Sequence, residues 1–213
     1  MKIITPSLQL YGSLEFAYEF FNTELFGGTL PPVVITLNCK RLSSKGYFIA
    51  KNYKERKSRR HSGEIALNPR WFDDSLEGIL ANFVHQMMHV WQHQASSASR
   101  AGYHNRIWSE QMKNIGLYPS STGKPGGLEV GQQVGQYVIQ KGRFDKACRK
   151  LLKAGFDVRW TEALADKKAK RSSTSKSPVG RISWRCPSCG LNAWAKPSAN
   201  LVCGDCNEDL LPR

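Results

Sequence analysis

The chain has 213 residues, a hydrophobic fraction of 40% and a net charge of +14 at neutral pH. This length accommodates one domain with a proper core and a small appendage. The excess of positive charge predicts an acidic partner, for which nucleic acid is the first candidate. A generally solubilising surface is the ordinary alternative.

No apolar run approaches the roughly 20 residues that span a bilayer, and the N-terminal residues lack the pattern of a signal peptide. We therefore expect no membrane association and a location in the cytoplasm, or in the nucleoid if the protein binds DNA. Four of the six cysteines form two C-x-x-C pairs, which in a reducing compartment indicate metal binding rather than disulfides. Cys39 and Cys148 have no paired spacing and are expected to be ordinary reduced residues.

The N-terminal half predicts one helix followed by a small sheet. Apolar residues at three- and four-residue spacing indicate an amphipathic helix over residues 8–26. Residues 33–37, 46–50 and 64–67 are typical of strands, and the basic stretch 51–60 connects the last two. The simplest arrangement is a small antiparallel sheet with a charged hairpin.

A second helix is predicted to start at residues 73–75, with Asp74 and Glu77 in the positions of a capping box. Its apolar residues share one broad face, namely Leu76, Ile79, Leu80, Phe83, Val84, Met87 and Trp91. His85 and His89 fall on the opposite side of this helix. The two histidines are therefore expected to face something other than the core.

The remaining predicted elements, in chain order, are a helix over 104–115, a short strand over 137–139 and a helix over 144–152. A Lys/Ser-rich stretch without hydrophobic periodicity then predicts a flexible linker. We expect an α+β domain over residues 1–165, the basic linker over 166–181 and a separate small module over 182–213.

The stretch from His85 to His89 departs by one residue from the H-E-x-x-H signature of zinc proteases. Two histidines four residues apart lie about 6 Å apart on one side of a helix, so their rings can converge on one ion. His104, after a loop that can turn back, is the best candidate for a third ligand. Helix rise carries His93 too far, and His61 lies in the basic connection. Coincidental surface histidines are the alternative.

Gln86 occupies the position at which the signature has its glutamate. In metalloproteases of this type the glutamate is a general base and not a metal ligand. An amide accepts or donates hydrogen bonds, but it cannot take a proton from water. Zinc binding is therefore expected to survive, and hydrolysis is not.

Cys186, Cys189, Cys203 and Cys206 form two C-x-x-C knuckles near the C-terminus. Each knuckle places two thiolates on one tight turn, and four thiolates close a tetrahedral structural zinc site. About thirty residues cannot bury a sufficient core, so the metal is expected to stabilise this module.

Basic and aromatic residues in and before this module are candidates for nucleic-acid contacts. They are Lys167, Lys168, Lys170, Arg171, Arg181, Trp184, Arg185, Trp194 and Lys196. Two alternatives remain open. The tryptophans would pack the small core, and the basic residues would belong to a solvated linker.

These features resemble the SprT-like, Spartan-related family of zincin metalloproteases, in the bacterial form that carries a C-terminal zinc ribbon. The resemblance rests on His85, His89, residues 90–94 (Val-Trp-Gln-His-Gln), residues 102–105 (Gly-Tyr-His-Asn) and the four cysteines. It implies a zincin fold, a DNA-associated protease activity on a protein substrate, and two zinc ions per chain. It also implies that His85, His89 and His104 bind the catalytic-type zinc.

The glutamine at position 86 departs from this family. Either the chain is an inactivated variant of a protease, or it is a naturally degenerate relative retained for binding. The rival interpretation is a non-enzymatic nucleic-acid-binding protein with a structural metal, and a redox or metal-storage protein is a weaker third. Tyr103 or His93 would assist an oxyanion, although packing or ligand support is the more ordinary role for each.

Overall fold

The computed structural model describes residues 5–38, 44–98, 100, 102–162 and 181–212. The chain divides into two compact units, Met1–Leu164 and Ala165–Arg213. Helices and small sheets together give the α+β class that the sequence predicts. None of the helices in the described ranges is both long enough and apolar enough to cross a bilayer.

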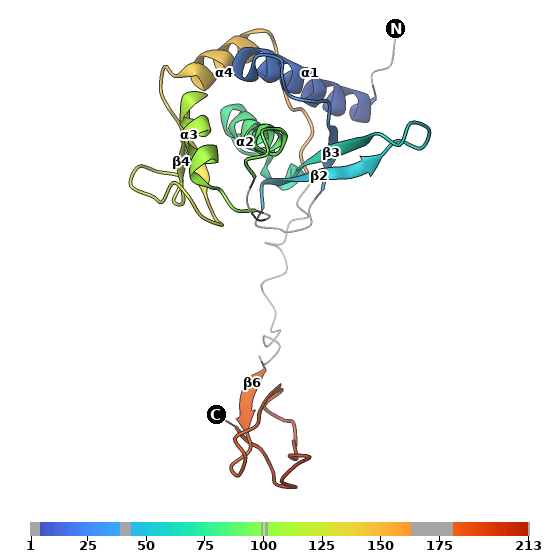
Figure 1. Ribbon diagram of the computed structural model, residues 1–213, viewed down its shortest axis with the longest axis vertical. Coiled ribbons are helices and arrows are strands. Elements are labelled where there is room, and N and C mark those ends of the chain that lie inside the picture. The colour runs from blue at the N-terminus through green and yellow to red at the C-terminus, as the bar shows by residue number, and fades with distance from the viewer. Residues whose placement is uncertain (1–4, 39–43, 99, 101, 163–180, 213) are drawn as a thin grey trace, which may run out of the picture. The chain divides into compact units, whose positions relative to one another are not determined.

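The first unit contains four α-helices, one short 3-10 helix and two small sheets among its described residues (Figure 1). In chain order these elements are α1 (Pro6–Phe26), β1 (Val34–Leu37), β2 (Gly46–Lys54), β3 (His61–Leu67), the 3-10 helix (Pro69–Trp71), α2 (Leu76–Gln94), α3 (Arg106–Asn114), β4 (Leu117–Ser120), β5 (Gly135–Val138) and α4 (Arg143–Lys153).

Helix α2 lies at the centre of the first unit, with α1 and α4 on one side, α3 and β4 on a second, and β2 and β3 on a third (Figure 1). Its predicted apolar face is in the core, where Leu80, Phe83 and Val84 are fully buried. The expectation that the opposite face lies outside the core is wrong. His85 and Gln86 are buried too, because α3 and β5 cover that face.

The first sheet has the order β1-β3-β2 and is mixed, not antiparallel as predicted. β2 and β3 form the expected antiparallel hairpin, whereas β1 pairs with β3 in parallel. The central strand β3 is the most buried, with Ile65, Ala66 and Leu67 fully inside. A strand buried in this way requires backbone partners on both edges, and β1 supplies the second.

The start of α2 also differs from the prediction. The Ser75 side chain caps the helix by accepting a hydrogen bond from the backbone N–H of Gly78 at 3.1 Å. Asp74 instead forms an ion pair with Lys45 at 2.6 Å. Both serine and aspartate are favourable capping residues, so their order in the chain could not decide between them.

The second unit is a small three-stranded sheet of order β7-β6-β8, formed by β6 (Ile182–Arg185), β7 (Asn192–Ala195) and β8 (Leu211–Pro212). Its buried core consists of Trp184, Cys186, Cys203 and Leu210. The predicted linker, 166–181, lies outside the described residues except for its last position.

Candidate metal centres

Three histidines from separate parts of the first unit meet at one point. His85 and His89 lie on consecutive turns of α2, and His104 precedes α3. The Nε2 atom of His104 is 3.1 Å from that of His85 and 3.2 Å from that of His89. Two nitrogens bound tetrahedrally to zinc at about 2.0–2.1 Å would be about 3.3–3.4 Å apart. The three rings therefore have the spacing of a metal site.

Each ring is fixed through its other nitrogen. His85 Nδ1 is 2.7 Å from Gln136 Oε1, and His104 Nδ1 is 3.0 Å from the carbonyl oxygen of Gly131. His89 Nδ1 has a longer contact, 3.4 Å, to Gln92 Oε1. Each of these oxygens can accept a hydrogen bond from an Nδ1–H group, which leaves the three Nε2 lone pairs directed at one another. Such support of the distal nitrogen is characteristic of histidines that bind metals.

Burial keeps these imidazoles neutral. Desolvation is the largest cause of a lowered pKa at all three histidines, and it lowers the pKa of His89 to about 4. The neighbouring imidazoles lower the pKa of His85 and His89 further. Neutral imidazole is the form that binds a metal.

Trp108 packs against all three histidine rings. Its fully buried ring lies 4.4 Å from the His104 ring, 4.9 Å from that of His85 and 5.4 Å from that of His89, measured between centroids. It reaches this position because Asn105 caps α3 by accepting a hydrogen bond from the Trp108 backbone N–H at 2.9 Å. Of the three histidines, His89 is the one that is only partly buried.

Gln86 lies on α2 next to the first ligand and is 5% exposed. Within the described ranges, no group forms a hydrogen bond with its side-chain amide. None of the acceptors that orient the three histidines belongs to residue 86 either. The histidine group is therefore assembled independently of the residue at the base position.

The other histidines and Tyr103 lie outside this group. His93 is exposed, and its ring centroid is 6.1 Å from that of Phe48. His61 is exposed at the start of β3. Tyr103 stacks under the Arg100 guanidinium at 4.9 Å and lines a cavity of about 410 Å³ beside α3. Neither side chain is among the three that converge on the candidate metal site.

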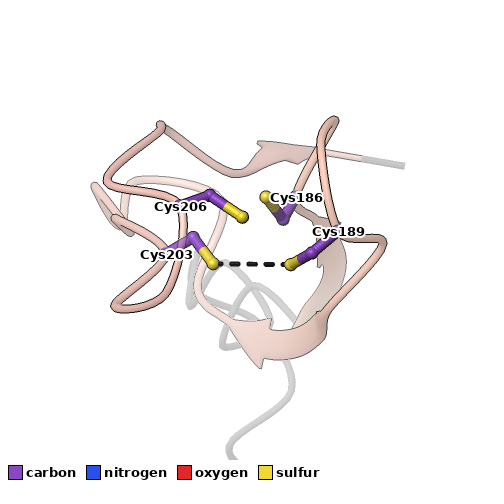
Figure 2. A group of neighbouring side chains, drawn as sticks. All are labelled: Cys186, Cys189, Cys203 and Cys206. Carbon is purple, nitrogen blue, oxygen red and sulfur yellow. Dashed lines mark hydrogen bonds between the residues drawn. The ribbon is translucent and has the colours of Figure 1, made fainter.

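The second unit brings four cysteine sulfurs together, and Figure 2 shows all four directed at a common centre. The sulfurs of Cys189 and Cys203 are 3.6 Å apart and no disulfide joins them. Zinc–sulfur bonds of about 2.3 Å in a tetrahedron would place two sulfurs about 3.8 Å apart. This cluster can hold a metal ion, as the spacing of the knuckles predicts.

The two knuckles have the same backbone geometry. The N–H of Gly190 donates to the carbonyl oxygen of Cys186 at 3.0 Å, and the N–H of Asn207 donates to that of Cys203 at 2.8 Å. Both donors have positive φ, 76° and 54°. Glycine and asparagine adopt this conformation most readily. Backbone hydrogen bonds, led by that from Cys189, lower the pKa of Cys186 to about 7, which favours the thiolate that zinc requires.

The predicted nucleic-acid contacts divide into three sets. Trp184 is buried in the core of the second unit, which corresponds to the packing alternative and removes it as a stacking surface. Trp194 is 69% exposed on the neighbouring strand. Arg181, Arg185 and Lys196 are exposed as well. Lys167, Lys168, Lys170 and Arg171 lie outside the described residues.

Gln136, Gly131 and Trp108 were not found from the sequence. Gln136 lies 51 positions from His85 and comes into contact with it only because β5 pairs with β4. No motif connects these residues to the histidine pair. One indication was available for Trp108, because it follows the candidate ligand His104 at the spacing of one helical turn.

Comparison with known proteins gives one relationship. No family model and no solved structure matches the chain. An "uncharacterized protein in mucB 3'region" of Salmonella typhimurium is 40% identical over 58 residues, which make up 27% of this chain and 77% of that protein. This chain therefore belongs to the same family as the Salmonella protein.

Proposed function

We propose that this protein is a SprT-like zinc metalloprotease that associates with DNA and whose hydrolytic activity is disabled by Gln86. Its first unit would hold a catalytic-type zinc through His85, His89 and His104, and its second unit a structural zinc. The observation that carries the proposal is the convergence of three neutral imidazoles whose Nε2 atoms lie within 4.8 Å of one another.

The number of ligands supports a catalytic rather than a purely structural site. Among the described residues, the histidine group contains three side chains with suitable donor atoms and no fourth. Three protein ligands leave the fourth position of a zinc ion to water or substrate, whereas structural sites use four. The four-cysteine cluster in the second unit has the structural pattern.

The chemistry of residue 86 explains why turnover would be low. A bound zinc would polarise water and the scissile carbonyl. Proton removal from that water is the task of a general base, which typically contributes 10²–10⁴-fold to the rate. Gln86 occupies the position of this base in the H-E-x-x-H pattern, but its side-chain amide cannot take up a proton at neutral pH. The three histidines are also unsuited to it, because their lone pairs would be used by the metal.

A non-enzymatic zinc protein that binds nucleic acid is the second candidate. Gln86 itself favours it, as do the net charge of +14 and the exposed Trp194 beside basic residues in the second unit. On this account the histidine site would serve stability or partner binding. The two candidates differ in whether restoring a carboxylate at position 86 restores hydrolysis.

The test compares the full-length native chain with Gln86→Glu and with Gln86→Glu/His104→Ala. Each protein is assayed for zinc content and for cleavage of a denatured protein substrate, with and without duplex DNA. We expect two zinc ions per chain for the first two proteins, one for the third, and cleavage at least about 10²-fold faster for Gln86→Glu than for the native chain. An inert Gln86→Glu protein with two zinc ions would favour the non-enzymatic candidate. A native chain with no zinc bound to the histidines would refute the site itself.

A further inference from the structure

The β2–β3 hairpin extends past the helices of the first unit (Figure 1). Its outer part, residues 51–61, is exposed at every position. We call this segment the basic hairpin. It contains six lysines and arginines and a single acidic residue, Glu55. A surface segment that buries nothing and concentrates one charge contributes little to the core of its own unit.

Most of the cations in the basic hairpin have no counter-ion among the residues that the structure describes. Within the described residues, the one ion pair of this segment joins Arg60 and Glu55, at 3.1 Å. In the part of the chain that the structure describes, no ion pair involves the other five cations, which are Lys51, Lys54, Arg56, Lys57 and Arg59. On α4, two of the five cations, Arg149 and Lys150, pair with Asp145 and Glu24 at 2.6 Å. Five of the six cations of the hairpin therefore have no ion pair among the described residues.

The hairpin is nevertheless an ordered element. Glu55 organises its turn: the backbone N–H of Glu55 donates to the carbonyl oxygen of Arg60 at 2.8 Å, and the N–H of Arg59 donates to that of Glu55 at 3.1 Å. The Glu55 carboxylate also accepts hydrogen bonds from Ser58 and Arg60, which lower its pKa. A register shift between Ile49 and Tyr53 marks a bulge at the base of the hairpin. A bulge bends and twists the strands beyond it.

We infer that the basic hairpin is a second nucleic-acid contact, which enters a groove of duplex DNA and binds the phosphates on its rims. The inference deepens the DNA association proposed above and does not depend on the peptidase ancestry. The site consists of the unpaired lysines and arginines of residues 51–59, and its ligand is the phosphate backbone rather than a particular base sequence.

The shape of the hairpin favours duplex DNA over other acidic partners. The major groove of B-form DNA admits a two-stranded β-ribbon, whereas the major groove of A-form RNA is too narrow for protein side chains to read. A membrane-surface segment would add an apolar face beside its cations. In this hairpin the large apolar side chain is Tyr53, which is only 41% exposed.

The test measures the salt dependence of binding with two variants of equal charge. The hairpin variant is Lys54→Gln/Arg56→Gln/Lys57→Gln. The control variant is Lys124→Gln/Lys146→Gln/Lys153→Gln, which removes three exposed cations from other parts of the first unit. Each full-length protein is titrated against a fluorescent 20-base-pair DNA duplex, the matching RNA duplex and anionic phosphatidylserine vesicles, at several salt concentrations. Zinc content and melting temperature establish that each variant is folded.

Each phosphate contact contributes about 0.9 to the slope of log K against log salt. We expect the hairpin variant to lose about 2–3 from the slope for DNA and at least about tenfold in affinity at 0.1 M salt. The control variant should lose less than about a third of that slope change, and RNA affinity should respond to both variants alike. Equal losses of DNA affinity in the two variants would overturn the inference, because net charge would then suffice. The inference would also be overturned if the hairpin variant lost affinity for the vesicles alone, or lost as much affinity for the RNA duplex as for the DNA duplex. A native chain without DNA affinity would refute the proposed DNA association and the inference together, whereas native binding without a hairpin effect would refute the inference alone.

Discussion

Replacing Gln136 by leucine tests whether the histidine group is a metal site with built-in support. Gln136 Oε1 lies 2.7 Å from His85 Nδ1, the shortest of the three contacts that orient these rings. Leucine has a similar volume and no acceptor, so the substitution removes the hydrogen bond with little change in packing. His85 would then lose the group that fixes its tautomer and the orientation of its ring.

Loss of such a support typically weakens metal binding by 10–100-fold, which corresponds to about 1.4–2.7 kcal/mol. We expect a loss of this size at one of the two zinc sites and no change at the other, because the cysteine cluster lies in a separate unit. Competition with a chromophoric zinc chelator, on the full-length chain, measures both affinities. Gln136→Glu is the matched control, since its carboxylate can still accept a hydrogen bond from His85 Nδ1. This variant should have a zinc affinity at or above the native value.

Two results would refute this reasoning. If Gln136→Leu binds zinc as tightly as the native chain, the 2.7 Å contact does not position a ligand. If Gln136→Glu weakens binding as much as Gln136→Leu, the effect comes from disturbed packing of β5 and not from the lost acceptor. A loss at both zinc sites would mean that the substitution acts through general unfolding.

Three further predictions concern the surroundings of the metal sites and the core. Trp108→Ala should lower the free energy of unfolding, measured by urea titration, by about 3–5 kcal/mol, because it leaves a cavity at a fully buried position. Trp108→Phe should lower it much less, since the indole N–H has no hydrogen-bond partner among the described residues. With metal removed, the lowered pKa of His89 means that the unfolded chain takes up a proton at a higher pH than the folded chain. As the pH falls from about 6.5 towards 4, the free energy of unfolding should therefore decrease by up to about 1.4 kcal/mol per pH unit for His89. A flat profile in denaturant titrations would contradict the burial of this histidine. Gly116→Ala should destabilise the first unit, because φ there is +95° and a Cβ would lie 2.7 Å from the backbone nitrogen of Phe144; a melting temperature equal to that of the native chain would contradict this geometry.

The sequence predicted helices better than the sheets, and the reason is physical. A helix is closed by local hydrogen bonds and a local apolar period, so α1 and α4 start and end within two residues of their predicted bounds. Strand order depends on partners that are distant in the chain, and the parallel pairing of β1 with β3 leaves no local trace. β4 was missed altogether, because Pro119 argues against a strand.

In the candidate sites too, features set by local sequence could be predicted and features set by long-range contacts could not. The metal-binding groups could be predicted because four-residue spacing on a helix and two-residue spacing in a knuckle are local facts. His104 was selected among the three remaining histidines because it follows a loop that can turn back, while His93 lies too far along the helix and His61 in the basic connection. The acceptors Gln136 and Gly131 could not be predicted, since they reach the ligands through the pairing of β5 with β4 and the bridge between Gly131 and His104.

The side chain of residue 86 takes no part in positioning the three histidines, so the histidine group does not depend on which residue stands there. The groups that orient the three histidines lie on α2, on β5 and at the strand bridge of Gly131. Trp108, on α3, packs against the three rings. Residue 86 contributes to none of these contacts. If the proposed function holds, an exchange between glutamine and glutamate at position 86 should leave the three histidines and the packing of α2 in place. The expectation that Gln86→Glu keeps two zinc ions per chain rests on this separation.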